Sequence, residues 1–206
     1  MVLAIREAAP SAPLEDPACR RAVFAAIDRL SLAEDHASDG PDWIPAYALS
    51  PPGLASYDAD YRQFPDGQGR GDLAQARSDL TACGWPAGFG MRIAVLPGAE
   101  ASVEALQSGL ERVGITVQPA GEGPADAVLL VVQAREPGVV AFFDPLARKG
   151  PAGDLGLTAV QTLLDSDLGG DPGMEREQGR MIDRMLLSTL RYLPLIAERA
   201  PGVERG

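Results

Sequence analysis

The sequence has few of the residues on which catalytic and metal sites are built. Its 206 residues include one histidine and two cysteines. A structural metal site needs several clustered ligands, and a histidine-based triad needs a nucleophile and an orienting acid besides the base. No G-x-S-x-G motif accompanies His36, so we expect it to be a solvated residue that follows a helix. The sequence therefore predicts a protein that is not an enzyme and holds no metal and no cofactor.

The two cysteines, Cys19 and Cys83, lie far apart in the sequence, and both fall in segments with helical patterns. This spacing indicates neither a disulfide framework nor a metal knuckle. We therefore expect both to be small apolar residues of the core.

Positive charge is scarce as well. Lys149 is the only lysine, and 18 basic against 29 acidic residues give a net charge of −11. Such a chain repels nucleic-acid phosphates and anionic lipid surfaces, and no cluster of arginines with aromatics offsets this repulsion. Nucleic acid is therefore excluded as an expected partner.

Long apolar runs are also absent. The longest, at residues 127–132, is far shorter than the roughly 20 residues that span a bilayer. Residues 1–7 carry a charge at Arg6 and lack the apolar centre of a signal peptide. We therefore expect no membrane insertion and, for the sequence as written, a cytoplasmic location.

What the sequence does contain is an alternation of helical and strand patterns. Apolar spacing predicts helices at 16–30, 72–83, 102–113, 157–164 and 171–190. Asp16 and Asp72 can cap two of these helices, Asp171 or Pro172 opens the last, and Gly84 can end the second. Strands are predicted at 91–96, 115–118, 127–132 and 192–197, with Pro194 at the edge of the last. The pattern predicts an α/β fold, a small mixed sheet flanked by helices, in a single domain spanning 1–206.

A long irregular segment at 38–71 interrupts this alternation. Its prolines forbid a long helix or a central strand, and its aromatic residues supply too much apolar surface for disorder. Trp43 and Tyr47 have two interpretations. They form an aromatic wall for a ligand, or they pin the segment onto the core.

Three blocks of sequence resemble a known family. Residues 16–29 read D-P-A-C-R-R-A-V-F-A-A-I-D-R, similar to the family pattern D-x-x-V-R-x-A-[LIF]-x-x-A-I-D-R. Residues 72–89, together with A-L-Q at 105–107 and V-G-I-T-V at 113–117, are similar to D-x-A-K-A-x-x-L-L-x-x-A-G-[YW]-x-x-G-F followed by L-Q-x-x-L-x-x-[IV]-G-I-x-V. Residues 181–185 and 192–195 resemble its last helix and terminal strand. The chain thus resembles the C-terminal lobe of extracellular solute-binding protein family 5, the peptide- and nickel-type binding components of ABC transporters.

The resemblance implies a periplasmic-binding-protein-like lobe of type II that binds a peptide or another small polar ligand. It also implies an ABC permease as partner, and a first lobe that precedes this one. If the chain is a fragment of such a protein, the implied location is extracellular or periplasmic.

One segment departs from the family pattern. In family members the strand that matches 127–132 leads into G-W-x-x-D-x-x-[DN]-P, whereas here it leads into Q-A-R-E-P-G. Gln133, Arg135 and Glu136 are the candidate ligand-binding residues at this strand end, with Glu136 a loose substitute for the acidic residue. A surface ion pair is the alternative role for Arg135 and Glu136.

Two functions from different classes follow. The first is a non-catalytic binding lobe that closes with another lobe over its ligand by hinge motion. The second is a repurposed cytoplasmic module that forms a homodimer or docks on a biosynthetic enzyme through its former interlobe surface.

Overall fold

The fold is built on a five-stranded mixed sheet with the strand order β4-β3-β5-β1-β6. A computed structural model describes residues 1–7, 11–36, 42–63, 69–133, 138–148, 150–153, 155–166 and 170–199. The strands of this sheet are β1 Val2–Ile5, β3 Gly90–Val95, β4 Thr116–Pro119, β5 Ala127–Leu130 and β6 Tyr192–Pro194. β3 runs parallel to β4 and β5, whereas β1 is antiparallel to β5 and β6. The predicted α/β class with a small mixed sheet is confirmed.

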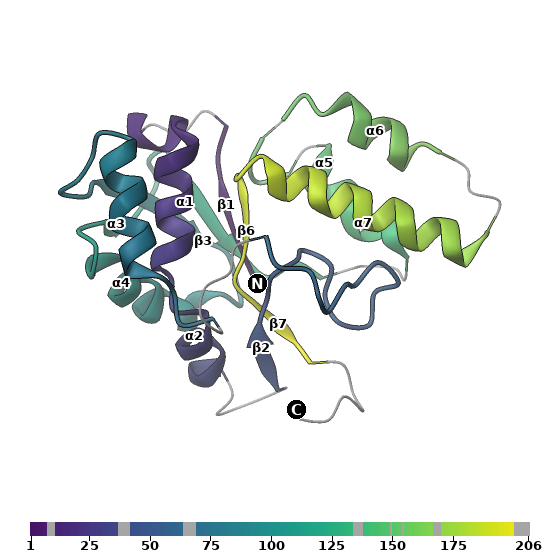
Figure 1. The fold of residues 1–206 in the computed structure, drawn as a ribbon, viewed down its shortest axis with the longest axis horizontal. Coiled ribbons are helices and arrows are strands. Elements are labelled where there is room, and N and C mark those ends of the chain that lie inside the picture. The colour runs from purple at the N-terminus through teal and green to yellow at the C-terminus, as the bar shows by residue number, and fades with distance from the viewer. Residues whose placement is uncertain are drawn as a thin grey trace.

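Helices cover both faces of the sheet, which gives three layers (Figure 1). One layer holds α1 Pro17–Ala26, α2 Arg29–His36, α3 Leu73–Ala82 and α4 Val103–Glu111, and the other holds α5 Val139–Ala147, α6 Thr158–Leu164 and α7 Pro172–Ser188. Short 3-10 helices lie at η1 Ala12–Glu15 and η2 Glu100–Ser102. Alternate residues of β1 enter the two cores, Leu3 on the α1 side and Ala4 on the α7 side. This alternation explains why all of β1 is buried.

The first predicted helix, 16–30, is two helices. It begins as expected, because the Asp16 carboxylate accepts a hydrogen bond from the Ala18 N–H at 2.7 Å and Pro17 occupies the first turn. It ends at Ala26, where Ile27 adopts an extended conformation. Residues 69–72 cross the chain at this break, since the Asp72 N–H donates to the Ala25 carbonyl. The Ala25 carbonyl, near the end of α1, is therefore bonded to a distant part of the chain. The next helix, α2, begins at Arg29.

The two cysteines form a disulfide, so the expectation of two unpaired apolar residues is wrong. Cys19 on α1 and Cys83 at the end of α3 have Cα atoms 5.6 Å apart across 64 residues of sequence. The two helices pack side by side on the same face of the sheet (Figure 1). The pairing depends on this packing, which the linear spacing of the cysteines does not reveal.

Apart from the short 3-10 helices and most of α2, three elements were not predicted. β1 lies between β5 and β6, at residues for which the sequence pattern predicted no strand. α5 lies in the region 136–153, whose prolines and glycines obscured a helix that contains Pro145. β2 Trp43–Pro45 lies in the irregular segment and pairs with β7 Ile196–Glu198 in a separate two-stranded sheet. The predicted strand 192–197 is therefore divided between two sheets, and β6, which contains Pro194, is an edge strand as expected.

No helix in the described ranges is long and apolar enough to cross a membrane.

Candidate functional site

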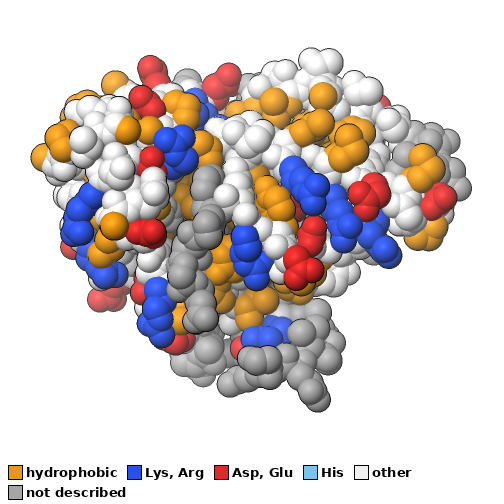
Figure 2. Space-filling model, in the orientation of Figure 1, with side chains coloured by type: hydrophobic (Ala, Val, Ile, Leu, Met, Phe, Trp, Pro, Cys, Tyr) orange, Lys and Arg blue, Asp and Glu red, His pale blue; other side chains and the backbone are white. Residues whose placement is uncertain are grey.

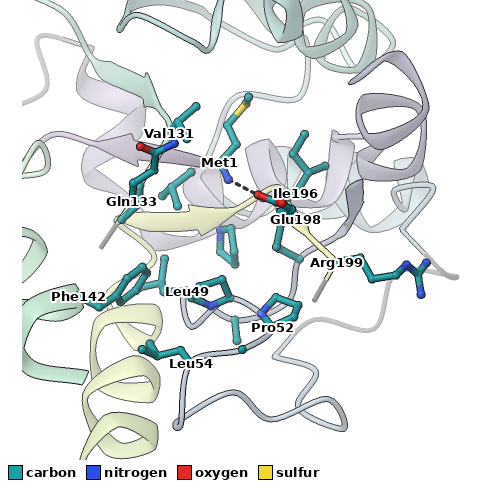
Figure 3. A pocket seen from close by; sticks show the side chains of 18 of the residues that line it. Met1, Leu49, Pro52, Leu54, Val131, Gln133, Phe142, Ile196, Glu198 and Arg199 are labelled. Atoms are coloured by element: carbon teal, nitrogen blue, oxygen red, sulfur yellow. Dashed lines mark hydrogen bonds between the residues drawn. The ribbon is translucent and has the colours of Figure 1, made fainter. Parts of the chain in front are cut away.

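A cavity of about 900 Å³ opens beside the end of the sheet (Figure 3). Six stretches of chain far apart in the sequence contribute to its described lining: residues 1–2, 43–55, 131–133, 138–142, 194–199, and Glu175 of α7. Most of the lining side chains are apolar, among them Leu49, Leu54 and Phe142 (Figure 3). An apolar cavity with a few polar groups is the usual form of a small-molecule site.

The buried strand β5 brings the chain to this cavity. Residues 131–133 follow its carboxyl end, and Val131, Val132 and Gln133 line the cavity. β3 and β5 are parallel neighbours, and the carboxyl ends of parallel strands are where α/β folds place binding residues. Gln133 was a predicted site residue for this reason, and the structure places it in the cavity.

One end of the cavity lies where the chain passes from β6, in the five-stranded sheet, to β7, in the two-stranded sheet. The Met1 amino group donates to the Ile196 carbonyl at 2.5 Å, and the Leu195 N–H donates to the Met1 carbonyl at 3.0 Å (Figure 3). These bonds extend the β1–β6 pairing past Pro194 toward β7.

One wall of the cavity, residues 46–55, is irregular chain held in place by α7. The Asp183 carboxylate accepts hydrogen bonds from the backbone N–H groups of Leu49 at 3.0 Å and Ser50 at 2.9 Å. Asp183 is 4% exposed, and this burial raises its pKa, although the two backbone donors act in the opposite direction. The Ser50 and Ser56 hydroxyls are 2.8 Å apart, which closes the segment on itself.

The same wall also lies against Gly179 of α7. A Cβ atom at Gly179 would lie 2.4 Å from the Cβ of Ser56, closer than real Cβ contacts allow. Glycine at this position therefore lets the segment lie directly on the helix.

Tyr47 does not line this cavity, because it packs against buried arginine. Arg29 is fully buried, and its guanidinium lies 4.3 Å from the Tyr47 ring centroid and 4.5 Å from that of Phe24. Arg62 lies 4.0 Å from the same tyrosine ring. Arg29 also donates to the Ala46 carbonyl. These contacts are those of a residue that pins the segment, the second of the two interpretations.

Trp43 lines the cavity and is partly buried against the core. Its ring centroid lies 5.4 Å from that of His36, whose Nε2 is 2.5 Å from the hydroxyl of the fully buried Ser102. His36 is the last residue of α2 and is half-buried, so the expectation of a solvated residue beyond a helix is wrong. Burial lowers the pKa of His36. The hydrogen bond with Ser102 braces α2 against η2.

Within the described residues, the charged members of the lining are Glu175, Glu198 and Arg199. Glu175 lies in the first turn of α7 and accepts a hydrogen bond from the Val139 N–H at 3.1 Å. The sequence offered no signal for it, because its place in the cavity depends on how α7 packs on α5. Arg135 and Glu136, the other two predicted site residues, lie outside the described residues.

Among the described side chains, no three His, Cys, Asp or Glu residues lie close enough together to hold a metal ion.

Comparison with known families gives one match. The sequence model of the bacterial extracellular solute-binding proteins, family 5 Middle, matches residues 2–142. A search of curated proteins found no match.

Solved structures show the same fold in larger proteins. The clavulanic acid biosynthesis oligopeptide binding protein 2 is 24% identical with a TM-score of 0.78, over 97% of this chain and 42% of that one. The dipeptide binding protein from Pseudoalteromonas sp. SM9913, in complex with Met-Leu, is 24% identical with a TM-score of 0.78, over 96% and 42%. This chain therefore spans less than half the length of these two proteins.

A third structure has a similar length. A peptide-binding protein of a peptide ABC transporter is 18% identical with a TM-score of 0.67, and the match covers 95% of this chain and 96% of that one. The shared architecture is that of part of a type II periplasmic binding protein.

Proposed function

Because the chain belongs to family 5 of the bacterial extracellular solute-binding proteins, we propose that it forms one lobe of a binding protein that presents a peptide or another small polar ligand to an ABC importer. The cavity of about 900 Å³ carries the proposal. Its volume lies within the roughly 300–1,000 Å³ of small-molecule sites, and its lining is apolar with a few polar groups. The proposed role is binding, without a catalytic step.

Trp43 and Gln133 are the proposed ligand contacts. The indole ring of Trp43 offers a large flat apolar surface at low cost in conformational entropy. The Gln133 amide carries both donors and an acceptor, which match the N–H and C=O groups of a peptide backbone. Arg135 and Glu136 stay predictions, and Tyr47 supports the site indirectly by holding the wall.

The lobe presents one side of the binding site. Ligand pockets bury most of the ligand surface, and the described lining of this cavity comes from the sheet ends, residues 43–55 and the α5–α7 side of the sheet. We propose that a second lobe covers the ligand from the other side, in keeping with the larger chains that this one matches in part. An ABC permease is the proposed recipient of the ligand.

The proposed location is outside the cytoplasm. The family consists of extracellular proteins, and the Cys19–Cys83 disulfide is of the kind that persists in oxidising compartments. The alternative of a cytoplasmic homodimer or enzyme-docking module gains no support from the family or from the structural neighbours.

Fluorescence of Trp43 tests the proposal directly. The chain has two tryptophans, and Trp85 is 43% exposed, packs on Phe89 and does not line the cavity. In a W85F variant, titration with di- to pentapeptides, beginning with Met-Leu, should change the Trp43 emission in a saturable way.

The control is the reciprocal variant W43F, whose remaining Trp85 should not respond. We expect dissociation constants on the order of 1 mM, because one lobe buries only part of the ligand. If no peptide changes Trp43 emission at several times that concentration, or if Trp85 responds equally, the proposed function is wrong.

A further inference from the structure

A row of three arginines follows the exposed side of α7. Arg176, Arg180 and Arg184 are four residues apart, so they share one side of the helix, about 6 Å from one to the next along its axis. Arg180 pairs with Glu177 at 3.1 Å, through one nitrogen. Arg184 pairs in the same way with Asp58 at 3.3 Å, and Arg176 has no ion-pair partner among the residues that the structure describes. Because a guanidinium carries several N–H donors, all three arginines have donors left for a further carboxylate.

A row of three methionines lies beside the arginines. Met174, Met181 and Met185 lie four residues before, three after and seven after Gln178, spacings that put them on the same face of α7 as Gln178. The Gln178 side chain donates to the Leu163 carbonyl of α6, so the methionine row borders the contact between α6 and α7. Met174 is 54% exposed and Met181 is 47% exposed, although most large apolar side chains of the described chain are buried. The row is therefore an open apolar surface.

The two rows are neighbours on one side of the molecule. Arg184 follows Met181 by three residues, a spacing that brings side chains together on a helix. Figure 2 shows basic side chains in a row along α7 and hydrophobic side chains over the neighbouring α6. No residue of either row is part of the described cavity lining. We call this surface the α7 face, and it consists of Met174, Arg176, Arg180, Met181, Arg184 and Met185.

The composition of the α7 face is typical of protein interfaces. Arginine and methionine are both enriched in such interfaces, and flexible methionine side chains adapt to the shape of a bound segment. An anionic lipid bilayer matches the face less well, because the net charge of −11 repels a broad anionic surface. A partner protein that presents carboxylates only opposite the arginines avoids most of this repulsion.

We propose that the α7 face is the docking surface for an amphipathic helix of a partner protein. The apolar side of that helix packs on the methionine row, and carboxylates along its flank bind the arginine row by charge-assisted hydrogen bonds. The two rows run in parallel along a helix of 17 residues, which matches the parallel apolar and acidic sides of an amphipathic helix. The α7 face is separate from the cavity, so the proposal goes beyond the ligand-binding function and does not depend on it.

Binding of a designed peptide tests the proposal. The probe is a fluorescein-labelled helical peptide of the same length as α7, 17 residues, with leucines along one side and glutamates along the flank. Its fluorescence anisotropy should rise in a saturable way with the full chain, with a dissociation constant on the order of 100 μM for a small exposed interface. The control peptide has lysine in place of every glutamate and should bind at least about tenfold more weakly.

Two double variants of the chain test the arginine row. R176E/R184E reverses two charges of the row and should weaken binding of the glutamate peptide by about tenfold or more, because attractive pairs become repulsive. The matched control is R77E/R112E, which makes the same change in net charge at two exposed arginines of the other helical layer. This control should bind the peptide as the unchanged chain does.

A third variant tests the methionine row. M174Q/M181Q keeps the length of both side chains, removes their apolar character, and should also weaken peptide binding by about tenfold or more. Both methionines are exposed, so the variant should melt at the same temperature as the unchanged chain. Melting followed by circular dichroism, measured for every variant, separates lost binding from lost folding.

Several results would overturn the proposal. They are binding of neither peptide, equal binding of both peptides, and a loss of binding in R77E/R112E as large as that in R176E/R184E. Binding to vesicles that contain phosphatidylglycerol, lost in R176E/R184E, together with no binding of the glutamate peptide, would identify a lipid surface as the partner instead. A dimer in light scattering that R176E/R184E dissociates would assign the α7 face to a second copy of the chain.

Discussion

Loss of the Cys19–Cys83 disulfide should strongly destabilise the chain. The bridge closes a loop of 64 residues, and the loop-closure relation gives about 4 kcal/mol of stabilisation at 25 °C for that length. The stabilisation arises mainly in the unfolded state, which the bridge keeps from expanding. For a chain of this size the loss corresponds to a fall in melting temperature of roughly 8–16 °C.

The measurement is unfolding by urea and by heat, followed by far-ultraviolet circular dichroism, for the oxidised chain, the reduced chain and C19A/C83A. The reduced chain and the double variant should lose similar amounts of stability. Cys19 is fully buried, so its replacement by alanine adds a small cavity cost that reduction does not. Reductant should not affect the double variant, which controls for other effects of the reagent.

Two results would refute this reasoning. The first is a thiol titration that finds two free cysteines in protein purified without reductant. The second is an oxidised chain that unfolds at the same urea concentration as the reduced chain, because loop closure would then contribute nothing to its stability. A change in the slope of the urea transition, by contrast, is expected, since an open chain exposes more surface on unfolding.

Two further predictions concern the support of the cavity. G179A should lower the free energy of unfolding by about 1–3 kcal/mol in urea denaturation and weaken peptide binding, because the new Cβ atom would lie 2.4 Å from the Cβ of Ser56. An unchanged urea midpoint would contradict the close packing of residues 46–56 on α7. For His36, burial favours the neutral ring in the folded chain, so its contribution to stability is present above the unfolded pKa of about 6.5 and is lost as the pH falls through the lowered folded pKa. The unfolding free energy of the unchanged chain should therefore fall more steeply below pH 6.5 than that of H36Q, and parallel pH profiles for the two proteins would show that His36 is not buried as described.

The helix boundaries that could be predicted depend on neighbours in the sequence. The side chains of Asp16 and Asp72 each accept a hydrogen bond from a backbone N–H two or three residues further on, as their cap patterns predicted, and Asp171 does the same at the start of α7. Gly84 adopts a φ of 84°, the left-handed conformation expected after α3. These signals are local, because a cap needs only residues within one helical turn.

The features that could not be predicted depend on contacts between distant residues. The break at Ile27 accompanies the crossing of residues 69–72, and β1 becomes a central strand only because β5 and β6 pair with it. Glu175 enters the cavity lining through the packing of α7 on α5. A single sequence carries no pattern for such pairings, so β3, β4 and β5 could be predicted, but neither β1 nor the full set of cavity residues could.

Two buried charged residues, Arg29 and Asp183, hold the cavity wall in place. Irregular chain cannot satisfy its own backbone polar groups, so residues 46–50 depend on other parts of the protein for partners. Arg29, from one helical layer, donates to the Ala46 carbonyl, and Asp183, from the other, accepts the N–H groups of Leu49 and Ser50. The wall is therefore fixed to both layers at once, and its shape depends on the spacing between them. A shift of either layer would change the shape of the cavity, so we expect replacement of Arg29 or Asp183 to weaken peptide binding although neither residue lines the cavity.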